Sequence, residues 1–489
     1  MGLFFRPDDG VAGDFIPFYA DGLWHLFYLK DYRDPARHGE GTPWFHLVSR
    51  DLVHYEDWGE ALPRGAADEQ DLYVFTGSVL AAEGRYHIYY TGHNPHLAQQ
   101  GRPAQGIMRA TSADLRTWRK DDLLPLFAPT ELGYERDDWR DPFVFWNQEA
   151  GEYWMLLAAR RATGPSRYRG CTALAASRDL VTWEVREPFW APELYVTHEC
   201  PDLFRQGDWW YLLYSTYSER LVTHYRMSRS LQGPWMAPPR DTLDGRAHYA
   251  AKTASDSEER YLFGWLATRE GETDAGRWQW GGNLVAHRVV TLDDGTLGAQ
   301  APAPLLRHLR GKALPLAPRM ILGSWRLEGD AAWTESCDAG VLLPGTGTGV
   351  GRPSSNAMLR LGEGPEPLLL EARVRYQPGT QACGLLLRLD HESEGWYELR
   401  LEPARQRLVI DRWPRPGDEP YMLEQPLPLR AHSPVQLRAI VDGDCLVAYA
   451  DDRVALSCRL YDHPQGAWGL FVREGAARFE GLAAHAPAR

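Results

Sequence analysis

The sequence predicts an all-β protein, in which a five-bladed β-propeller is followed by a C-terminal β-sandwich. Three observations support this prediction. An aromatic strand motif recurs five times in the first 300 residues, a second motif follows most of its copies, and short alternating strands occupy the chain after residue 324. Repeats that each supply about four short strands are typical of propeller blades. Helical periodicity is weak, and we expect only one short helix, near residues 305–309.

The first motif is a turn followed by an aromatic-rich strand, with copies at residues 21–28, 83–90, 151–157, 207–214 and 259–265. The second begins with Ser and reads Ser-x-Asp-Leu at residues 49–55, 112–118 and 177–183, with a degraded copy at 228–235. The spacing leaves room for four antiparallel strands per repeat, so five copies predict five blades. The alternative is a sandwich with coincidental aromatic strands, but two motifs in constant order argue against it.

The composition changes after Gly298, where a Pro-rich stretch begins. We therefore expect a propeller domain at 1–308, a linker at 309–323 and a sandwich domain at 324–489. The strands of the last segment alternate apolar and polar residues, with a turn about every ten residues, as in a β-sandwich. Such a domain either binds carbohydrate or supports the propeller by packing, and the second role is the simpler one.

Composition restricts the possible partners. The net charge is −13 without a Lys/Arg block, which argues against nucleic acid. No apolar run approaches the roughly 20 residues of a membrane span, and no signal peptide is apparent, so we expect no membrane partner and a cytoplasmic location. Six scattered cysteines without C-x-x-C spacing predict free buried thiols. The 20 Trp and 23 Tyr suit either an aromatic core or a sugar-binding cleft.

Two stretches place acidic residues at what look like equivalent points of neighbouring repeats. Asp141 follows Arg140 and precedes Pro142, while Glu199 lies two residues before Pro201. Because proline disfavours a helical residue before it, Asp141 is expected to have an extended or turn geometry. A pair of carboxylates that face one pocket is the usual equipment for breaking a glycosidic bond.

At these motifs the chain resembles glycoside hydrolase family 32, the β-fructosidases, whose members combine a five-bladed propeller with a β-sandwich. The matching stretches are Phe5 to Asp14, Trp44-Phe-His46 with the segment after it, Phe75-Thr-Gly-Ser78, Trp139-Arg-Asp-Pro142, Glu199-Cys-Pro-Asp-Leu-Phe204 and Trp280-Gly-Gly-Asn-Leu284. The Arg-Asp-Pro stretch alone is weakly specific, but the glutamate motif in the next repeat makes the resemblance strong.

The resemblance implies hydrolysis of a furanoside, such as a β-fructofuranoside, with retention of configuration. Asp14 would be the nucleophile, and Glu199 the acid/base, with a pKa raised by partial burial and neighbouring carboxylates. Asp141 would bind sugar hydroxyls in the transition state, and Arg140 would either orient Asp141 or bind the ring hydroxyls itself. The remaining substrate-binding candidates are Trp44, Phe75, Ser78 and Trp280. No cofactor is implied.

The chain departs from the family pattern beside the nucleophile. The family usually carries Asn before this aspartate and Pro-Asn-Gly after it, whereas this chain has Gly13 before and Phe15-Ile-Pro17 after. Leu29 stands where the family tends to carry Gln. Two alternatives therefore stay open: a furanosidase for another sugar such as arabinofuranose, and a catalytically inactive propeller that binds carbohydrate. We expect His25, His46, His87 and His198 to be core or pocket residues, and we expect no catalytic metal.

Overall fold

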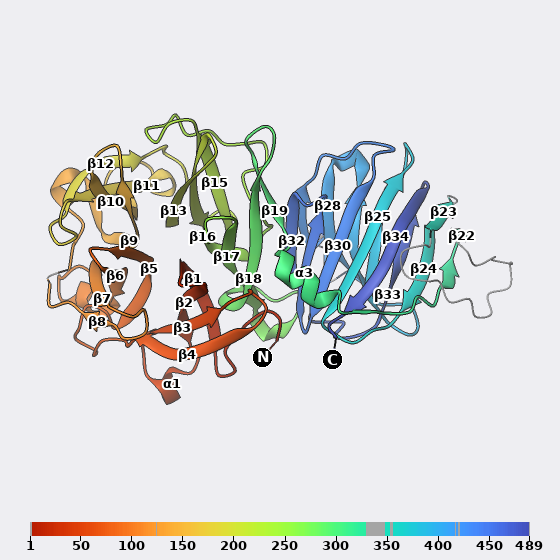
Figure 1. Ribbon diagram of the computed structural model, residues 1–489, viewed down its shortest axis with the longest axis horizontal. Helices are drawn as coiled ribbons and strands as arrows, with labels where there is room; N and C mark the ends of the chain where they lie inside the picture. Colours follow the sequence, from red (N-terminus) through yellow and green to blue (C-terminus); the bar gives the residue numbers. More distant parts are fainter. Residues whose placement is uncertain are drawn as a thin grey trace.

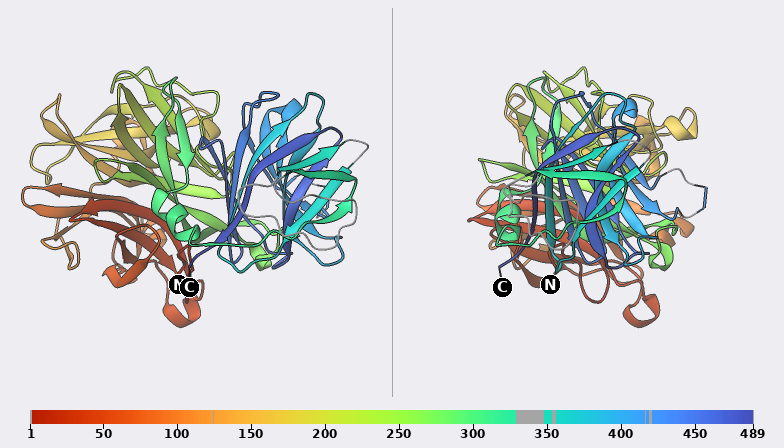
Figure 2. Two further views of the ribbon diagram at one scale, coloured as in Figure 1. Left: turned by 45° about the vertical axis from the view of Figure 1, so that its right-hand side comes forward. Right: turned by 90° about the vertical axis from the view of Figure 1, so that its right-hand side faces the viewer.

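The computed structural model describes residues 2–123, 125–328, 348–352, 356–415, 417–418 and 421–488. It contains two β domains that lie side by side (Figure 1). The view turned by 45° keeps this arrangement, with helix α3 (Ala303–Leu309) at the junction of the two domains (Figure 2, left). The all-β prediction is confirmed, and α3 is the short helix expected near residues 305–309.

The propeller has five blades of antiparallel strands. Blade 1 contains β1 (Val11–Ala20), β2 (Leu23–Asp31), β3 (Trp44–Ser49) and β4 (Tyr55–Leu62); blade 2 contains β5 (Tyr73–Ala82), β6 (Arg85–His93), β7 (Gln105–Ser112) and β8 (Arg119–Lys120). Blade 3 contains β9 (Tyr134–Asn147), β10 (Glu152–Arg161), β11 (Gly170–Ser177) and β12 (Glu184–Trp190); blade 4 contains β13 (Glu199–Gln206), β14 (Trp209–Thr216) and β15 (Val222–Ser228). Blade 5 contains β16 (His248–Ser255), β17 (Arg260–Arg269), β18 (Trp278–Thr291) and β19 (Leu297–Gln300). The short helices α1 (Pro35–His38) and α2 (Pro95–Gln99), together with 3-10 turns at Thr130–Leu132, Ser166–Tyr168 and Glu270–Glu272, lie in the connections.

Both sequence motifs have a fixed place in the blades. The aromatic motif forms the second strand of every blade: β2, β6, β10, β14 and β17. The Ser-x-Asp-Leu motif forms the turn after the third strand, where the aspartate side chain accepts backbone N–H groups two and three residues ahead. In blade 3, for example, Asp179 Oδ1 accepts from Val181 and Thr182 at 2.9 and 2.7 Å. The degraded copy of the motif follows β15 in blade 4, the blade in which the structure has three strands instead of four.

The first strands of the blades contact one another around the ring, so they are the innermost strands. Each of them contains a register shift, and in four of them the shift coincides with a residue of positive φ. These residues are Asp14, Asp141, Cys200 and Ala250, with φ between 47 and 60°. A β-bulge re-aims the side chains around it. The ring therefore directs several side chains toward one axial space.

The sandwich consists of two sheets. One sheet contains β22 (Ser324–Glu328), β23 (Thr348–Arg352), β34 (Ala477–Ala486), β25 (Leu368–Tyr376), β30 (Val435–Asp442), β31 (Cys445–Ala450) and β32 (Val454–Arg459), with β20 (Lys312–Ala313) paired to β34. The other contains β21 (Arg319–Leu322), β24 (Asn356–Gly362), β33 (Ala467–Arg473), β26 (Ala382–Leu389), β27 (Trp396–Glu402), β28 (Arg407–Trp413) and β29 (Leu423–Pro426), with a 3-10 turn at Pro403–Arg405. Because β20 and β21 pair with these sheets, part of the Pro-rich stretch is tied to the sandwich. The domain limits at 308 and 324 stay a prediction.

Buried polar groups join the two domains. Arg459 of β32 has no exposed surface, and its guanidinium donates to Leu266 O at 2.7 Å, Ala267 O at 3.1 Å and Asn283 Oδ1 at 2.8 Å in blade 5. Asp244 of the propeller accepts the Ser457 amide at 2.8 Å. One apolar cluster also includes side chains of both domains. The sandwich is therefore packed against the propeller rather than loosely tethered.

The described cysteines are buried and free, as expected: Cys171, Cys200, Cys383, Cys445 and Cys458. Cys337 lies outside the described residues. Within the part of the chain that the structure describes, no helix combines the length and the apolar character that a bilayer crossing requires.

Candidate active site

A cavity of about 330 Å³ lies where the innermost strands converge. Its walls combine four carboxylates and a guanidinium with other polar, apolar and aromatic side chains. The lining residues are Asp14, Leu29, Asp31, Thr42, Tyr73, Phe75, Arg140, Asp141, Glu199, Cys200, Tyr249 and Trp280. The structure thus brings Asp14, Asp141, Glu199 and Arg140, which the sequence places in three different repeats, around one space.

Asp14 lies at the bulge of β1, with φ 47°. Its Oδ1 accepts a hydrogen bond from the indole Nε1 of Trp265 at 3.0 Å. Burial, reinforced by the nearby Asp141 carboxylate, raises the pKa of Asp14 to about 7, although the Trp265 hydrogen bond acts in the opposite direction. One oxygen of Asp14 is thereby held, while the carboxylate as a whole lines the cavity.

Asp141 occupies the corresponding bulge of β9, with φ 60°. Its backbone amide donates to Thr91 Oγ1 at 2.8 Å, and its Oδ2 accepts the amide of Cys200 at 2.9 Å. Burial raises the pKa of Asp141 to about 6, and the adjacent Arg140 guanidinium opposes that rise. Asp141 is therefore held rigidly between blades 2 and 4.

Glu199 is the first residue of β13, and each of its carboxylate oxygens accepts a hydrogen bond. Arg140 Nη2 donates to Oε1 at 3.0 Å, and the Tyr249 hydroxyl donates to Oε2 at 2.5 Å. Arg140 also contacts Asp138 and approaches Asp141 Oδ2 to 3.9 Å. Arg140 is thus the cation that links Glu199 and Asp141.

The strand registers correct the expectation that Asp141 and Glu199 are equivalent. Arg140 pairs with Ala158 immediately before the bulge of β9, and Glu199 pairs with Ser215 immediately before the bulge of β13. Glu199 therefore corresponds to Arg140, and Asp141 corresponds to Cys200. The two carboxylates are offset by one residue, and they still reach one cavity because a bulge turns consecutive side chains toward the same space.

Two of the four further candidates line the cavity, and two do not. Phe75 and Trp280 line it. Trp44 is fully buried, and its indole N–H donates to Val74 O and Phe75 O at 3.1 Å, so it packs between strands and the expected sugar contact is wrong. The hydroxyl of Ser78 accepts the Val144 amide at 3.0 Å, which places it in the seam between blades 2 and 3.

Sequence reasoning did not assign roles to Trp265 and Tyr249. Trp265 ends the fifth aromatic strand motif, which the sequence explains equally well as core packing. Tyr249 precedes the bulge of β16 in a segment without a carboxylate motif. The available signal was position: Tyr249 stands immediately before the bulge of β16, as Arg140 and Glu199 stand before the bulges of β9 and β13, and Trp265 pairs with it.

Gly13 and Trp280 fit together beside the nucleophile. A Cβ atom added at Gly13 would lie 2.4 Å from Cζ2 of the Trp280 ring. The space that a side chain before Asp14 would fill is therefore taken by this indole. Together with Leu29 and Phe75, Trp280 gives the cavity apolar surface.

A second and larger hollow, of about 980 Å³, adjoins the cavity and shares Glu199, Tyr249 and Trp280 with it. It continues past Trp278 of blade 5 to Tyr421 and Met422 of the sandwich. Glu199 thus lies at the boundary between a small pocket and an open groove.

The four histidines considered as possible metal ligands are all buried, and none of them lines the cavity. Burial lowers the pKa of His46 and of His198 to about 3. Within the described ranges, metal-type ligands gather at Asp244, His248 and His287 near the sandwich. There Asp244 and His287 already share a hydrogen bond of 2.8 Å.

Comparisons with known proteins agree with this geometry. Residues 6–302, more than half of the chain, match the model of the glycosyl hydrolases family 32 N-terminal domain. The raffinose invertase of Escherichia coli is 29% identical over 400 residues, which cover 77% of this chain and 76% of that protein. The sucrose-6-phosphate hydrolase of Vibrio alginolyticus is 27% identical, with 63% of each chain covered.

Solved structures share the whole architecture. The sucrose-6-phosphate hydrolase from Lactobacillus gasseri superposes with a TM-score of 0.72 at 18% identity, covering 100% of this chain and 93% of that chain. The exo-inulinase from Aspergillus awamori has a TM-score of 0.70 at 17% identity, covering 100% and 98%. These likenesses establish the fold of both domains. The family match over most of the propeller establishes more: the chain belongs to glycosyl hydrolase family 32 and is a glycosidase.

Proposed function

We propose that this protein hydrolyses β-fructofuranosides with retention of configuration, by a double displacement in its axial cavity. The observation that carries the proposal is the meeting of Asp14, Asp141 and Glu199 around one 330 Å³ space, with Arg140 between the last two. A retaining glycosidase needs a nucleophile and an acid/base that flank one scissile bond. The names of the relatives, which include an invertase and a sucrose-6-phosphate hydrolase, support a fructofuranoside as substrate.

In the first step, Asp14 attacks the anomeric carbon while Glu199 protonates the leaving oxygen; in the second, Glu199 activates water. The Trp265 hydrogen bond at 3.0 Å orients the carboxylate of Asp14. The Asp141 carboxylate, fixed by the Cys200 amide, accepts hydrogen bonds from hydroxyl groups of the reacting sugar as positive charge develops on the sugar ring. The groove beyond Glu199 receives the leaving group, because the groove and the cavity meet at this residue.

The test measures products and stereochemistry together. The protein is incubated with sucrose, raffinose and short fructans, and proton NMR follows the anomer first released. We expect β-fructofuranose as the first product. Asp14→Ala should abolish turnover without changing the thermal melting curve by more than a few degrees. Release of the opposite anomer, or full activity of Asp14→Ala, would reject the proposal.

The acid/base role of Glu199 has its own signature. Glu199→Gln should reduce hydrolysis of sucrose far more than hydrolysis of an activated aryl fructofuranoside, which needs little protonation of its leaving group. Asp141→Asn should slow both substrates by a similar factor, because it removes transition-state binding rather than proton transfer. If Glu199→Gln slowed the hydrolysis of both substrates by the same factor, Glu199 would not be the general acid.

One observation favours a second candidate, a furanosidase for another sugar such as arabinofuranose. Leu29 and Trp280 supply apolar surface where the family pattern has amide side chains. Fewer polar groups in the wall mean fewer hydroxyls recognised. A panel of nitrophenyl furanosides decides between the candidates: a higher kcat/KM for the arabinofuranoside than for the fructofuranoside would favour the second.

A further inference from the structure

Trp280, which borders both the cavity and the groove, lies in a bulge of β18. Consecutive residues of β17 pair with Gln279 and Gly282 of β18, so Trp280 and Gly281 are two extra residues on that strand. The bulge adjoins Gly282, where blade 5 pairs with blade 1. Since a bulge changes where side chains point, the place of the Trp280 ring depends on how this bulge is held.

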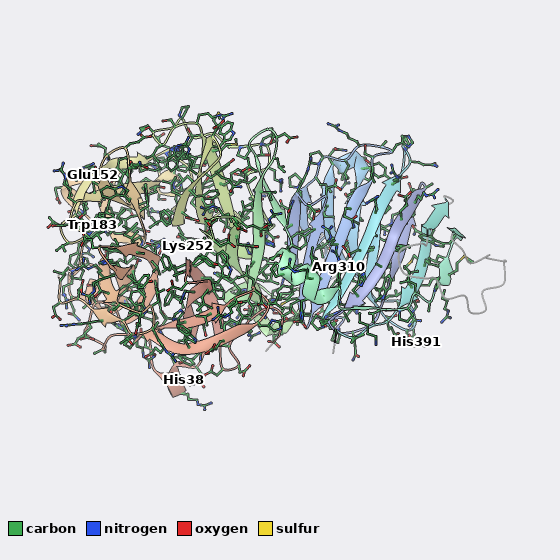
Figure 3. All side chains as sticks on the ribbon, viewed as in Figure 1. His38, Glu152, Trp183, Lys252, Arg310 and His391 are labelled. Atoms are coloured by element: carbon green, nitrogen blue, oxygen red, sulfur yellow. The ribbon has the colours of Figure 1, made fainter. Side chains whose placement is uncertain are left out.

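Arg33 holds the bulge from blade 1. It lies in the loop between β2 and β3, which also contains α1 with His38 at the edge of the propeller (Figure 3). Its Nη2 donates to Trp280 O at 2.5 Å and to Thr268 Oγ1 at 2.8 Å, and its Nη1 donates to Gln279 Oε1 at 2.9 Å. One guanidinium thus binds the bulged strand and the strand opposite it.

Further hydrogen bonds fix both ends of this link. Arg33 has φ 55°, and its amide donates to Oδ1 of Asp31, which itself lines the cavity, at 2.8 Å. Thr268 Oγ1 donates to Gly281 O at 3.3 Å, so both extra residues of the bulge are bound. A guanidinium presents its N–H donors in a fixed plane, which allows one side chain to hold several acceptors at once.

Trp280 needs this hold because its ring is not enclosed. The residue is 37% exposed, and its ring packs against Trp265, whose indole orients Asp14, with ring centroids 5.8 Å apart. The ring also lies against Gly13, where an added Cβ would be 2.4 Å from it. A shift of the bulge would therefore move the ring relative to two residues that adjoin the nucleophile.

We propose that Arg33 is a positioning residue, which sets the place of the Trp280 ring at the boundary between the cavity and the groove and thereby the fit of the substrate. The inference rests on the proposed function, in which the cavity binds the reacting sugar and the groove receives the leaving group. Arg33 itself lines neither hollow, so its effect on hydrolysis is transmitted through Trp280. The simpler alternative is that Arg33 only helps to close the ring of blades.

The decisive variant is Arg33→Met, which keeps a side chain of moderate length but removes every donor. Its kcat/KM on the best furanoside should fall about tenfold, because a displaced wall misplaces the reacting sugar. In the Trp280→Ala background, the same change should alter kcat/KM by less than about twofold. Equal losses in the two backgrounds would overturn the proposal and leave Arg33 a purely structural link. If Arg33→Met does not fold, Arg33→Gln is measured in the same two backgrounds and decides by the same outcomes.

Arg240→Met is the matched control. The Arg240 guanidinium also donates to backbone carbonyls, to Leu297 O of β19 at 3.0 Å and to Arg453 O of the sandwich at 2.9 Å. This change should lower Tm but leave kcat/KM within about twofold of the wild type. If Arg240→Met reduced kcat/KM as much as Arg33→Met, a general loss of stability would explain both results and the proposal would fail.

A measurement without substrate separates this inference from the proposed function. In hydroxyl-radical footprinting read out by mass spectrometry, Arg33→Met should change the oxidation rate of Trp280 by about twofold or more, because the bulge opens locally. Trp146, which is 49% exposed on β9, should keep its rate and serves as the internal reference. If no furanoside is hydrolysed but the rate of Trp280 changes, the proposed function fails and the positioning of the ring stands. An unchanged rate at Trp280 would refute the inference, whether or not the protein is active.

Discussion

Asp14 combines a backbone of positive φ, a single hydrogen-bond donor and largely apolar surroundings. The first two features fix its orientation, and the third makes its ionised form less favourable than in water. A nucleophile of this kind is reactive because its charge is poorly solvated, but the fraction that is ionised depends on pH in the neutral range.

We therefore expect the acid limb of kcat/KM to lie near neutrality. Asp14 attacks as a carboxylate, and its pKa in the free protein is about 7, so protonation below this value removes the nucleophile. The rate should fall about tenfold per pH unit on the acid side. A profile measured with an activated aryl fructofuranoside checks this, and an acid limb near pH 4 would contradict it.

The same shift has a consequence for stability. Because the pKa of Asp14 is raised from 3.8 to about 7 by folding, the folded state binds the proton more tightly, and stability is lost as pH rises between these values. Asp14→Asn, which has no charge to bury, should raise Tm at pH 8 by on the order of 2 °C or more. The gain should shrink at pH 4, where the wild-type residue is protonated. Scanning calorimetry at the two pH values measures the difference.

At the level of strands, the bulges of the innermost strands explain which predictions succeeded. The aromatic motif was readable because all five blades repeat it in their second strand. The one-residue offset between Asp141 and Glu199 could not be predicted, because the sequence does not reveal where a strand gains an extra residue. The side-chain direction of Trp44 depends on register for the same reason, since neighbouring residues of a strand face opposite ways.

Residues without a recurring motif were also beyond prediction. Tyr249 belongs to β16, whose sequence carries no carboxylate signature, and only the closed ring brings its hydroxyl to Glu199. The propeller, the sandwich and the three carboxylates followed from local patterns and from the family resemblance. Apart from Arg140, the partners of those carboxylates did not, since they come from distant parts of the chain.

The close fit of Gly13 and Trp280 predicts a strong coupling between β1 and β18. Gly13→Ala should displace the indole and lower kcat/KM at least tenfold, because the added Cβ would lie 2.4 Å from the ring. In the Trp280→Ala background the same change should cost little. A double-mutant cycle on kcat/KM measures this, and additive losses would show that the two residues act independently.

At the scale of the whole molecule, buried polar contacts and a shared apolar cluster make the two domains one packed unit. Arg459 is central to this contact, since its guanidinium reaches from β32 into blade 5. The sandwich also forms part of the groove that begins at Glu199. Its packing role is therefore compatible with a contribution to substrate binding.

Arg459→Met should destabilise the protein by about 3 to 5 kcal/mol, because the Leu266 and Ala267 carbonyls and Asp444 lose a buried partner. Urea unfolding followed by circular dichroism measures the loss. Arg405→Met, at a largely exposed arginine, serves as the control and should change stability by less than about 0.5 kcal/mol. A loss of that small size at Arg459 would mean that the domain contact does not depend on this residue.

The hydrogen bond from Trp265 to Asp14 joins residues that are 251 positions apart in the chain. Asp14 is synthesised in the first blade, but the indole that orients it and the phenol that binds Glu199 both come from the fifth. A nascent chain with four finished blades would therefore hold all three carboxylates and still lack the Trp265 indole on Asp14 and the Tyr249 hydroxyl on Glu199. Catalytic competence should appear in one step, when blade 5 joins blade 1, and enzymatic activity would then report the completion of synthesis and folding of the ring.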